Sequence, residues 1–266
     1  MTAVPKPLRF LRPHYATLKA RLDTHTPPTN PNHSLFASVV SVLAMTSATT
    51  DTRETLTYCL ATRNPAGVVI WGHEYMRHLA GEIATEYEDR HANAAVGTDP
   101  DVSDLLDLVR VIIPALFANN AEPEACDLCM EVERVDLLAD FCPEPSATRT
   151  CVYLTSCAAY FGPPRNTNIL QAAFSIFTKF HRSVDAARVA LKIGSPRSVM
   201  EEIFVQTTDP VDKQQLMYLY ARQGVHLDLD DGVCAQAITD DEQREDLRAI
   251  LGNAQVGIMR TTRSKI

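Results

Sequence analysis

The sequence lacks two features that are common in nucleic-acid-binding and membrane proteins, a cationic excess and a long apolar run. Its 33 acidic residues outnumber its 25 basic ones and give a net charge of -8, whereas nucleic acids and anionic membrane surfaces attract strong positive charge. Its apolar stretches, such as residues 111–113, are far shorter than the roughly 20 residues that span a bilayer. We therefore expect no nucleic acid and no membrane among its partners.

Sequence motifs that position a chemical reaction are also missing. The chain has no Gly-X-Ser-X-Gly elbow, no phosphate-binding Walker loop and no Gly-X-Gly-X-X-Gly fingerprint. Each of these motifs places a nucleophile or a phosphate group against backbone amides. Acyl transfer, nucleotide hydrolysis and dinucleotide chemistry therefore have no recognisable site. We expect no enzymatic activity, no catalytic residues and no cofactor.

Seven cysteines are present, an odd number in a chain without a secretory apolar segment. This favours a reducing compartment, the cytoplasm or the nucleus, over a disulfide framework. Cys126 and Cys129 have the C-x-x-C spacing of half a zinc site, but a complete site needs a second pair. Cys142, Cys151 and Cys157 do not supply that spacing. We interpret these cysteines as buried thiols.

His73, Glu74 and His78 invite comparison with the helical motif of zinc proteases, in which two histidines lie four residues apart on one helix face. Here the histidines are five residues apart, which places their imidazoles roughly 140° apart around a helix axis. We predict no metal site here. Instead we expect Glu74 to pair with Arg77 and His78 on the helix surface.

Helical periodicity is what the sequence does have, from about residue 65 onward. The clearest apolar stripe recurs at steps of three and four through Val102, Leu105, Leu106, Val109, Ile112, Ile113, Leu116 and Phe117. Strand signals are scarce. Helices are expected to pair at 101–118 with 123–140, 146–160 with 166–180, and 184–193 with 196–206. The sequence therefore predicts an all-α fold, an irregular α-solenoid of stacked helical hairpins.

A second stripe contains the single tryptophan of the chain. It consists of Trp71, Tyr75, Leu79, Ile83 and Tyr87, again at helical spacing. Large aromatic side chains contribute much of the apolar area that a core buries. We expect Trp71 to be the buried anchor of this helix.

Helix ends are marked by proline and glycine. Asn64-Pro65, Ser195-Pro196 and Asp209-Pro210 each combine a capping side chain with a proline suited to the first helical position. Gly194 and Gly224 follow periodic segments, where a left-handed residue closes a helix. These five positions predict three helix starts and two helix ends.

The N-terminal stretch is the one local charge anomaly. It carries Lys6, Arg9, Arg12, Lys19 and Arg21 and no acidic residue. A solvated helix with its lead-in explains this pattern, and so does a segment that docks on an acidic protein surface. Both interpretations stay open at this stage.

Several long segments resemble one protein family. They are WGHEYMRHLAGE (71–82), VPKPLRFLRPHY (4–15), SVLAMT (41–46), NAEPEACDLCMEVERVDLL (120–138), CVYLTSC (151–157) and FTKFHRSVDAARVAL (177–191). Together they resemble the helical N-terminal region of the largest non-ATPase subunit of the base of the 26S proteasome regulatory particle. That subunit is a ubiquitin-receptor scaffold with proteasome/cyclosome repeats. The resemblance extends to about residue 255.

The resemblance implies a non-enzymatic scaffold, a helical arm that supports the toroid built by the repeats and lies near the coiled coil of the ATPase ring. Its expected partners are proteasomal ATPase subunits and other regulatory-particle subunits. In the family, ubiquitin, ubiquitin-like shuttle factors and a deubiquitinase dock mainly on the toroid-forming repeats, which this sequence lacks. No binding residue can therefore be carried over, and the binding residues are unknown.

The resemblance also sets expectations for organisation. Residues 1–255 form the helical scaffold region, with softer joints near 26–32 and 92–100, and 256–266 form a divergent, frayed tail. The chain is expected to be a fragment, a divergent copy or a partial gene model, and to be cytoplasmic and nuclear. Leu247, Ile250 and Leu251 have no following helix to receive them, so we expect a sticky end there and self-association. The alternative function is a free-standing helical-repeat adaptor that recruits protein partners.

Overall fold

The structure, a computed structural model, describes residues 8–25, 29–47, 52–95, 97–238 and 240–263, with 25 and 254–263 described by their backbone alone. These residues form fifteen α-helices and three short 3-10 helices and contain no strand, which confirms the predicted all-α class. The chain divides into two units, residues 1–146 and 147–266. No helix in the described part combines the length and the apolar character that a membrane crossing requires.

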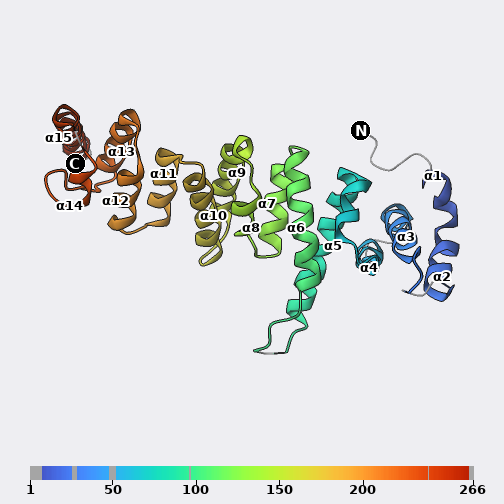
Figure 1. Cartoon of the computed structure of the whole chain (residues 1–266). Helices are drawn as coiled ribbons and strands as arrows, with labels where there is room; N and C mark the ends of the chain where they lie inside the picture. The colour runs from blue at the N-terminus through green and yellow to red at the C-terminus, as the bar shows by residue number, and fades with distance from the viewer. Residues whose placement is uncertain (1–7, 26–28, 48–51, 96, 239, 264–266) are drawn as a thin grey trace. The chain divides into compact units, whose positions relative to one another are not determined.

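The first unit contains ten helical segments before α9. They are α1 (Leu8–Leu11), η1 (Arg12–His14), α2 (Tyr15–His25), α3 (His33–Ser47), α4 (Glu54–Ala61), η2 (Pro65–Trp71), α5 (His73–Ala92), α6 (Ser103–Ala118), α7 (Glu122–Glu131) and α8 (Leu137–Phe141). Neighbours in sequence pack together: α2 with α3, α3 with α4, α4 with α5, α5 with α6, and α6 with α7. This is the stacking of helical hairpins that the periodicity predicts. Figure 1 shows α3 to α7 following one another in this order.

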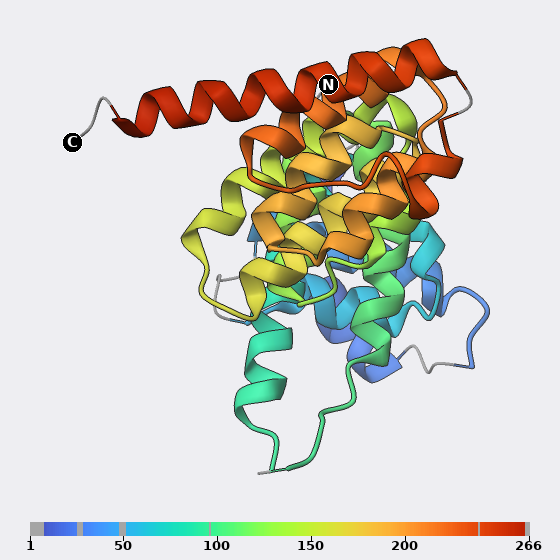
Figure 2. The same cartoon turned by 90° about the vertical axis from the view of Figure 1, so that its left-hand side faces the viewer.

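The core of this unit comes from the predicted stripes. Tyr75, Leu79 and Ile83 of α5 are fully buried, as are Leu105 and Ile112 of α6. Burying a large apolar side chain is worth about 1.5–3 kcal/mol, so the hydrophobic periodicity identifies residues through which α5 and α6 contribute to the core. The connection between these two helices projects beyond the rest of the unit in Figures 1 and 2.

The second unit continues α9 (Glu144–Cys157), which begins in the first. It then contains η3 (Ala158–Tyr160), α10 (Arg165–Lys179), α11 (Ser183–Ile193), α12 (Arg197–Gln206), α13 (Pro210–Arg222), α14 (Gly232–Gln236) and α15 (Asp241–Arg263). Helix α11 packs on α10, α12 and α13, and α13 packs on α15. Figure 2 shows α15 as one long helix in red. Phe204, Leu216, Met217 and Tyr220 are fully buried and belong to one hydrophobic cluster.

The apolar residues near the C-terminus belong to this cluster, so the expectation that they form an uncovered, sticky end is wrong. Leu247 is fully buried, and Ile250 and Leu251 pack against the same side chains. The preceding helices receive this face because α15 folds back onto α13. The predicted boundary at residue 255 between the helical region and the tail stays a prediction, as do the softer joints near 26–32 and 92–100. Residues 26–28, 96 and 264–266 lie outside the described part.

The predicted hairpins agree with the structure at five of their six helices, whereas the helix expected at 123–140 is two helices, α7 and α8. The break has a backbone cause. Glu133 takes a left-handed conformation, with a φ of 53°, and the Arg134 amide donates to the Cys129 carbonyl at 2.8 Å. This is the Schellman closure of a helix, made here without glycine.

The same closure recurs at four other helix ends. Gly194 and Gly224 have φ of 77° and 74°, as predicted, and Asn120 and His181 have φ of 56° and 54°. At each end, the amide of the following residue donates to a carbonyl five residues earlier in the chain. Only the two glycine closures could be read from the sequence, because Glu, His and Asn occur anywhere in a helix.

The three proline-marked starts have three outcomes. Asp209 caps α13 as predicted, since its carboxylate accepts a hydrogen bond from the Asp212 amide at 3.3 Å. Pro65 begins a 3-10 helix, and the Asn64 side chain makes no capping bond. The prediction at Ser195 is wrong by one residue, because the extended Pro196 is itself the residue before α12.

Candidate interaction surfaces

The histidines of the zinc-protease-like segment face different carboxylates. His78 Nε2 lies 2.9 Å from Glu82 Oε1, and His73 Nε2 lies 3.8 Å from Glu124 Oε1. The expected pairing of His78 with Glu74 is therefore wrong: the imidazole contacts the carboxylate one turn later, not the one before. Within the described residues, no three histidine, cysteine or acidic side chains are grouped to hold a metal ion. The absence of zinc stays a prediction.

The cysteines lie where buried thiols are expected. All seven are among the described residues and keep their thiols, and all except Cys157 are buried. Cys126 and Cys129 are inaccessible to solvent in α7. Burial raises the pKa of the Cys129 thiol above its ordinary value, so the thiolate that metal binding and redox chemistry require is disfavoured.

Glu82 joins α5 to the start of α4. Its carboxylate accepts a hydrogen bond from the Leu56 backbone amide at 2.7 Å, an amide that has no partner inside α4 because it lies in the first turn. Burial alone would raise the pKa of Glu82, but the hydrogen bonds from His78 and Leu56 outweigh burial and lower it. The carboxylate therefore stays ionised and acts as a cap supplied by a neighbouring helix.

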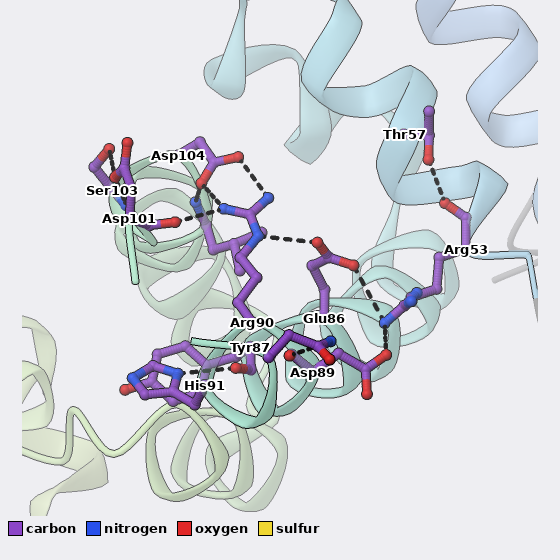
Figure 3. A network of polar contacts seen from close by, with 12 residues as sticks. Arg53, Thr57, Glu86, Tyr87, Asp89, Arg90, His91, Asp101, Ser103 and Asp104 are labelled. Carbon is purple, nitrogen blue, oxygen red and sulfur yellow. Dashed lines mark hydrogen bonds and ion pairs between the residues drawn. The ribbon is translucent and has the colours of Figure 1, made fainter. Parts of the chain in front are cut away.

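A second polar network holds three helices of the first unit together (Figure 3). Arg90 of α5 forms two hydrogen bonds with the Asp104 carboxylate of α6, at 2.6 and 3.0 Å. Its Nε also donates to Glu86 at 2.9 Å. Glu86 in turn lies 3.2 Å from Arg53, which precedes α4 and also pairs with Asp89. The chain of charges runs from α4 through α5 to α6.

The electrostatics of this network favour its charged form. Hydrogen bonds from Arg90 lower the pKa of the Asp104 carboxyl, and the pair with Asp104 raises the pKa of the Arg90 guanidinium. Fork-shaped contacts of this kind are stronger and more directional than single ion pairs. Figure 3 shows the side chains pointing at one another, so this network positions the helices that carry them.

The basic residues of the N-terminal stretch lie in two different environments. Lys19 and Tyr15 of α2 both contact the Glu54 carboxylate at the start of α4, so part of the stretch docks on its own chain. Arg9 and Arg12 are exposed, and Lys6 lies outside the described residues. Docking of the remaining arginines on an acidic partner stays a prediction.

Trp71 is not the buried anchor that was predicted. Gly72, with a φ of 90°, separates it from α5 and places it at the end of η2, where it is half-buried. Together with Leu35 and Ile70, which are 67% and 80% exposed, Trp71 lines a groove of about 420 Å³ between α3 and η2. The periodicity predicted one continuous face because it cannot register a left-handed glycine between two helices.

A second groove, of about 560 Å³, lies over α11 and α13. Its lining includes Val211 and Tyr218, which are 57% and 54% exposed, together with Arg188 and Arg222. Sequence reasoning missed both grooves. A single sequence does not distinguish exposed apolar residues from buried ones. The one available sign was that α13 has apolar residues on two of its faces. Both grooves present apolar side chains beside polar ones.

Comparison with known proteins identifies the family. A family model described as the RPN1 N-terminal domain matches residues 1–259. The chain is 39% identical over 257 residues to the 26S proteasome non-ATPase regulatory subunit 2 homolog A of Arabidopsis thaliana, covering 96% of this chain and 27% of that protein. It is 37% identical over 233 residues to the 26S proteasome regulatory subunit rpn1 of Schizosaccharomyces pombe, covering 87% and 25%.

A third relative gives the same result. The 26S proteasome non-ATPase regulatory subunit 2 of Dictyostelium discoideum is 40% identical over 225 residues, covering 85% of this chain and 24% of that protein. The chain thus spans about a quarter of the length of the curated relatives that it matches. The resemblance seen in segments such as 71–82 is confirmed, and the chain belongs to the RPN1 N-terminal domain family.

Proposed function

We propose that this chain is a non-catalytic scaffold segment of the base of the proteasome regulatory particle and acts in ubiquitin-dependent protein degradation in the cytoplasm and nucleus. Its role would be to support the ubiquitin-receptor toroid and its association with the ATPase ring. The observation that carries the proposal is the family match along residues 1–259. The three relatives reported above are named as regulatory subunits, and two of them as non-ATPase subunits.

The geometry supports a scaffold in two ways. The charged network around Arg90 and the Glu82 cap fix helices against one another through directional contacts. The grooves beside Trp71 and Tyr218 present apolar surface of the kind that marks protein-protein contact sites. A scaffold needs both, because rigid helices keep a contact surface in one shape and lower the entropic cost of binding.

The test is co-purification of the tagged full chain from cells, followed by cross-linking and mass spectrometry. The expected result is recovery of ATPase subunits and other regulatory-particle subunits, with cross-links to folded helices of this chain. Recovery of a different set of proteins without ATPase subunits would contradict the proposal and favour the adaptor alternative.

A misfolded chain could also reach the proteasome as a substrate, so the control must separate the two routes. Leu79→Asp places a charge at a fully buried position and should unfold the first unit. The proposal requires this variant to lose the cross-links to ATPase subunits. Equal recovery of the two chains would mean that the association is that of a substrate.

Ubiquitin provides a second test. Because docking in the family was expected on repeats that this sequence lacks, the chain alone should bind labelled ubiquitin very weakly or not at all in an NMR titration. Low-micromolar binding through the hydrophobic patch of ubiquitin would contradict this part of the proposal and would assign a receptor site to the described helices.

A further inference from the structure

Helix α13 has two apolar faces, and only one of them serves the core. Leu216, Met217 and Tyr220 are inaccessible to solvent and belong to the hydrophobic cluster of the second unit. Val211 and Tyr218 lie seven residues apart, so they share a second face of the helix. More than half of each of these two side chains is exposed. A helix that packs on one side normally carries polar residues on the opposite side, so the second apolar face needs another explanation.

The exposed face borders a groove rather than a flat surface. Val184 of α11 and Leu219 of α13 line the same space of about 560 Å³, and α11 packs directly on α13. Both helices belong to the second unit. The groove has room for two or three apolar side chains of a peptide, since one leucine residue occupies about a quarter to a third of that volume by the ordinary packing density of proteins.

The charge of the lining is opposite to that of the chain. Arg188 and Arg222 line the groove and no carboxylate does, although acidic residues outnumber basic ones 33 to 25 in the whole sequence. Arg188 lies 2.9 Å from the Asp185 carboxylate, which also pairs with Arg182. Arg222 makes no ion pair with any described carboxylate, and its guanidinium lies over the Tyr218 ring, 5.8 Å from the centroid.

We propose that this groove binds an acidic peptide segment of a partner protein, in which one or two bulky apolar side chains are flanked by carboxylates. The apolar side chains pack against Val211, Tyr218 and Leu219. The flanking carboxylates pair with Arg222 and Arg188, since a planar guanidinium matches a carboxylate with two parallel hydrogen bonds. Gln215 and its neighbouring glutamines can bond the peptide backbone. The inference goes beyond the proposed function, because it holds whether or not the chain assembles into a proteasome.

The combination of charges and apolar surface selects this occupant. Nucleic acids are bound by many cations that follow a phosphate backbone, whereas this lining has two arginines and three glutamines around four apolar or aromatic residues. A purely apolar partner would bury the Arg222 guanidinium without a counter-charge, which is costly, whereas Arg188 keeps its contact with Asp185. An acidic segment with apolar anchors satisfies both halves of the lining.

The test uses a display library of random twelve-residue peptides, panned on the full chain, followed by fluorescence anisotropy of the enriched peptides. The enriched peptides should combine Asp or Glu with Leu, Ile, Phe or Trp. Arg222→Glu should raise their Kd at least about tenfold, the size expected for losing one charge-assisted contact. Tyr218→Ser should weaken binding without changing charge, and raising the salt concentration should weaken it further.

Lys192→Glu is the matched control, because Lys192 is an exposed cation on α11 that does not line the groove. It should leave the Kd within about twofold, since exposed charges are largely screened by salt. Circular dichroism melts of all variants check folding, and Arg222→Gln replaces Arg222→Glu if the charge reversal unfolds the chain. Failure to enrich any peptide, or enrichment without acidic residues, would overturn the proposal. Equal losses of peptide affinity in Lys192→Glu and Arg222→Glu would also overturn it. The same holds if a twelve-nucleotide oligouridine binds as tightly as the peptides and its binding depends on Arg222.

Discussion

Replacing His181 with glycine should stabilise the second unit, although it removes a side chain and adds none. His181 follows α10 and has a φ of 54°. Its amide donates to the Thr178 carbonyl at 3.1 Å, and the next amide, of Arg182, donates to the Phe177 carbonyl at 2.9 Å. The closure therefore depends on a left-handed residue at position 181. The imidazole is exposed and makes no hydrogen bond with the described residues.

The size of the effect follows from two opposing terms. An L-residue in the left-handed region is strained by about 1–2 kcal/mol, a strain that glycine does not have. Glycine loses more backbone entropy on folding, which offsets about 0.5–1 kcal/mol of that gain. The net stabilisation should be about 0.5–1 kcal/mol. Gly194→Ala makes the opposite change at the end of α11, where a Cβ would meet no atom within 4 Å, so it should cost about 1 kcal/mol through the backbone alone.

Thermal unfolding followed by circular dichroism measures both changes. His181→Gly should raise the Tm by roughly 2–4 °C, the shift expected for about 1 kcal/mol in a domain of this size. His181→Ala is the matched control, because it removes the imidazole but keeps a Cβ, and its Tm should stay near that of the unchanged chain. If glycine and alanine at position 181 gave the same Tm, the assignment of strain to this closure would be refuted.

Three further outcomes are expected. Maleimide should react first at Cys157, the only partly exposed cysteine of the seven, all of which are described. The Cys157→Ser variant should lose this fast phase of labelling. Burial raises the pKa of Cys59 to about 11, so labelling of Cys59 at the same rate as Cys157 would contradict its buried position. Arg90→Gln should lower the urea midpoint at about pH 7 and much less at about pH 3, because a depressed carboxyl pKa contributes stability above the ordinary value of about 4 and loses it as the pH falls through the folded value. Hydrogen bonds from Arg90 lower the pKa of Asp104, so equal losses at both pH values would refute this origin. Trp71→Ala should cost about 1–2 kcal/mol in urea unfolding followed by circular dichroism, less than the roughly 3–5 kcal/mol of a fully buried aromatic, and a larger loss would show that the indole is the anchor of its helix after all.

The sequence predicts the fold class and most helix positions because both depend on local patterns. The stripe from Leu105 to Phe117 is buried in α6 except at the half-buried Leu106, and Asp209 caps α13 where the Asp-Pro pair places it. Both features need only the residues of one helix and its first turn. The break after α7 was missed because Glu133 is left-handed, and glutamate, unlike glycine, has no preference for that conformation.

The partners of polar side chains were harder to predict than the helices that carry them. His78 could pair one turn back with Glu74 or one turn forward with Glu82, and the usual preference for an acid on the N-terminal side favours Glu74. The structure selects Glu82 because that carboxylate also caps α4 through the Leu56 amide. A long-range requirement therefore decided a local choice, and such requirements appear only once the helices are placed in space.

The interaction surfaces show the limit of periodicity most clearly, because hydrophobic spacing measures amphipathicity and not what covers each face. Along α13, Leu216 and Tyr220 lie four residues apart and Val211 and Tyr218 lie seven apart, so each pair shares one helix face. The sequence gives no reason to prefer either pair for the core. Helices α12 and α15 cover the first set, so the second is left beside Arg188 and Arg222 in an open groove. An apolar face left over after the core is complete, next to cations without a carboxylate in the lining, is a surface whose partner must supply both kinds of contact.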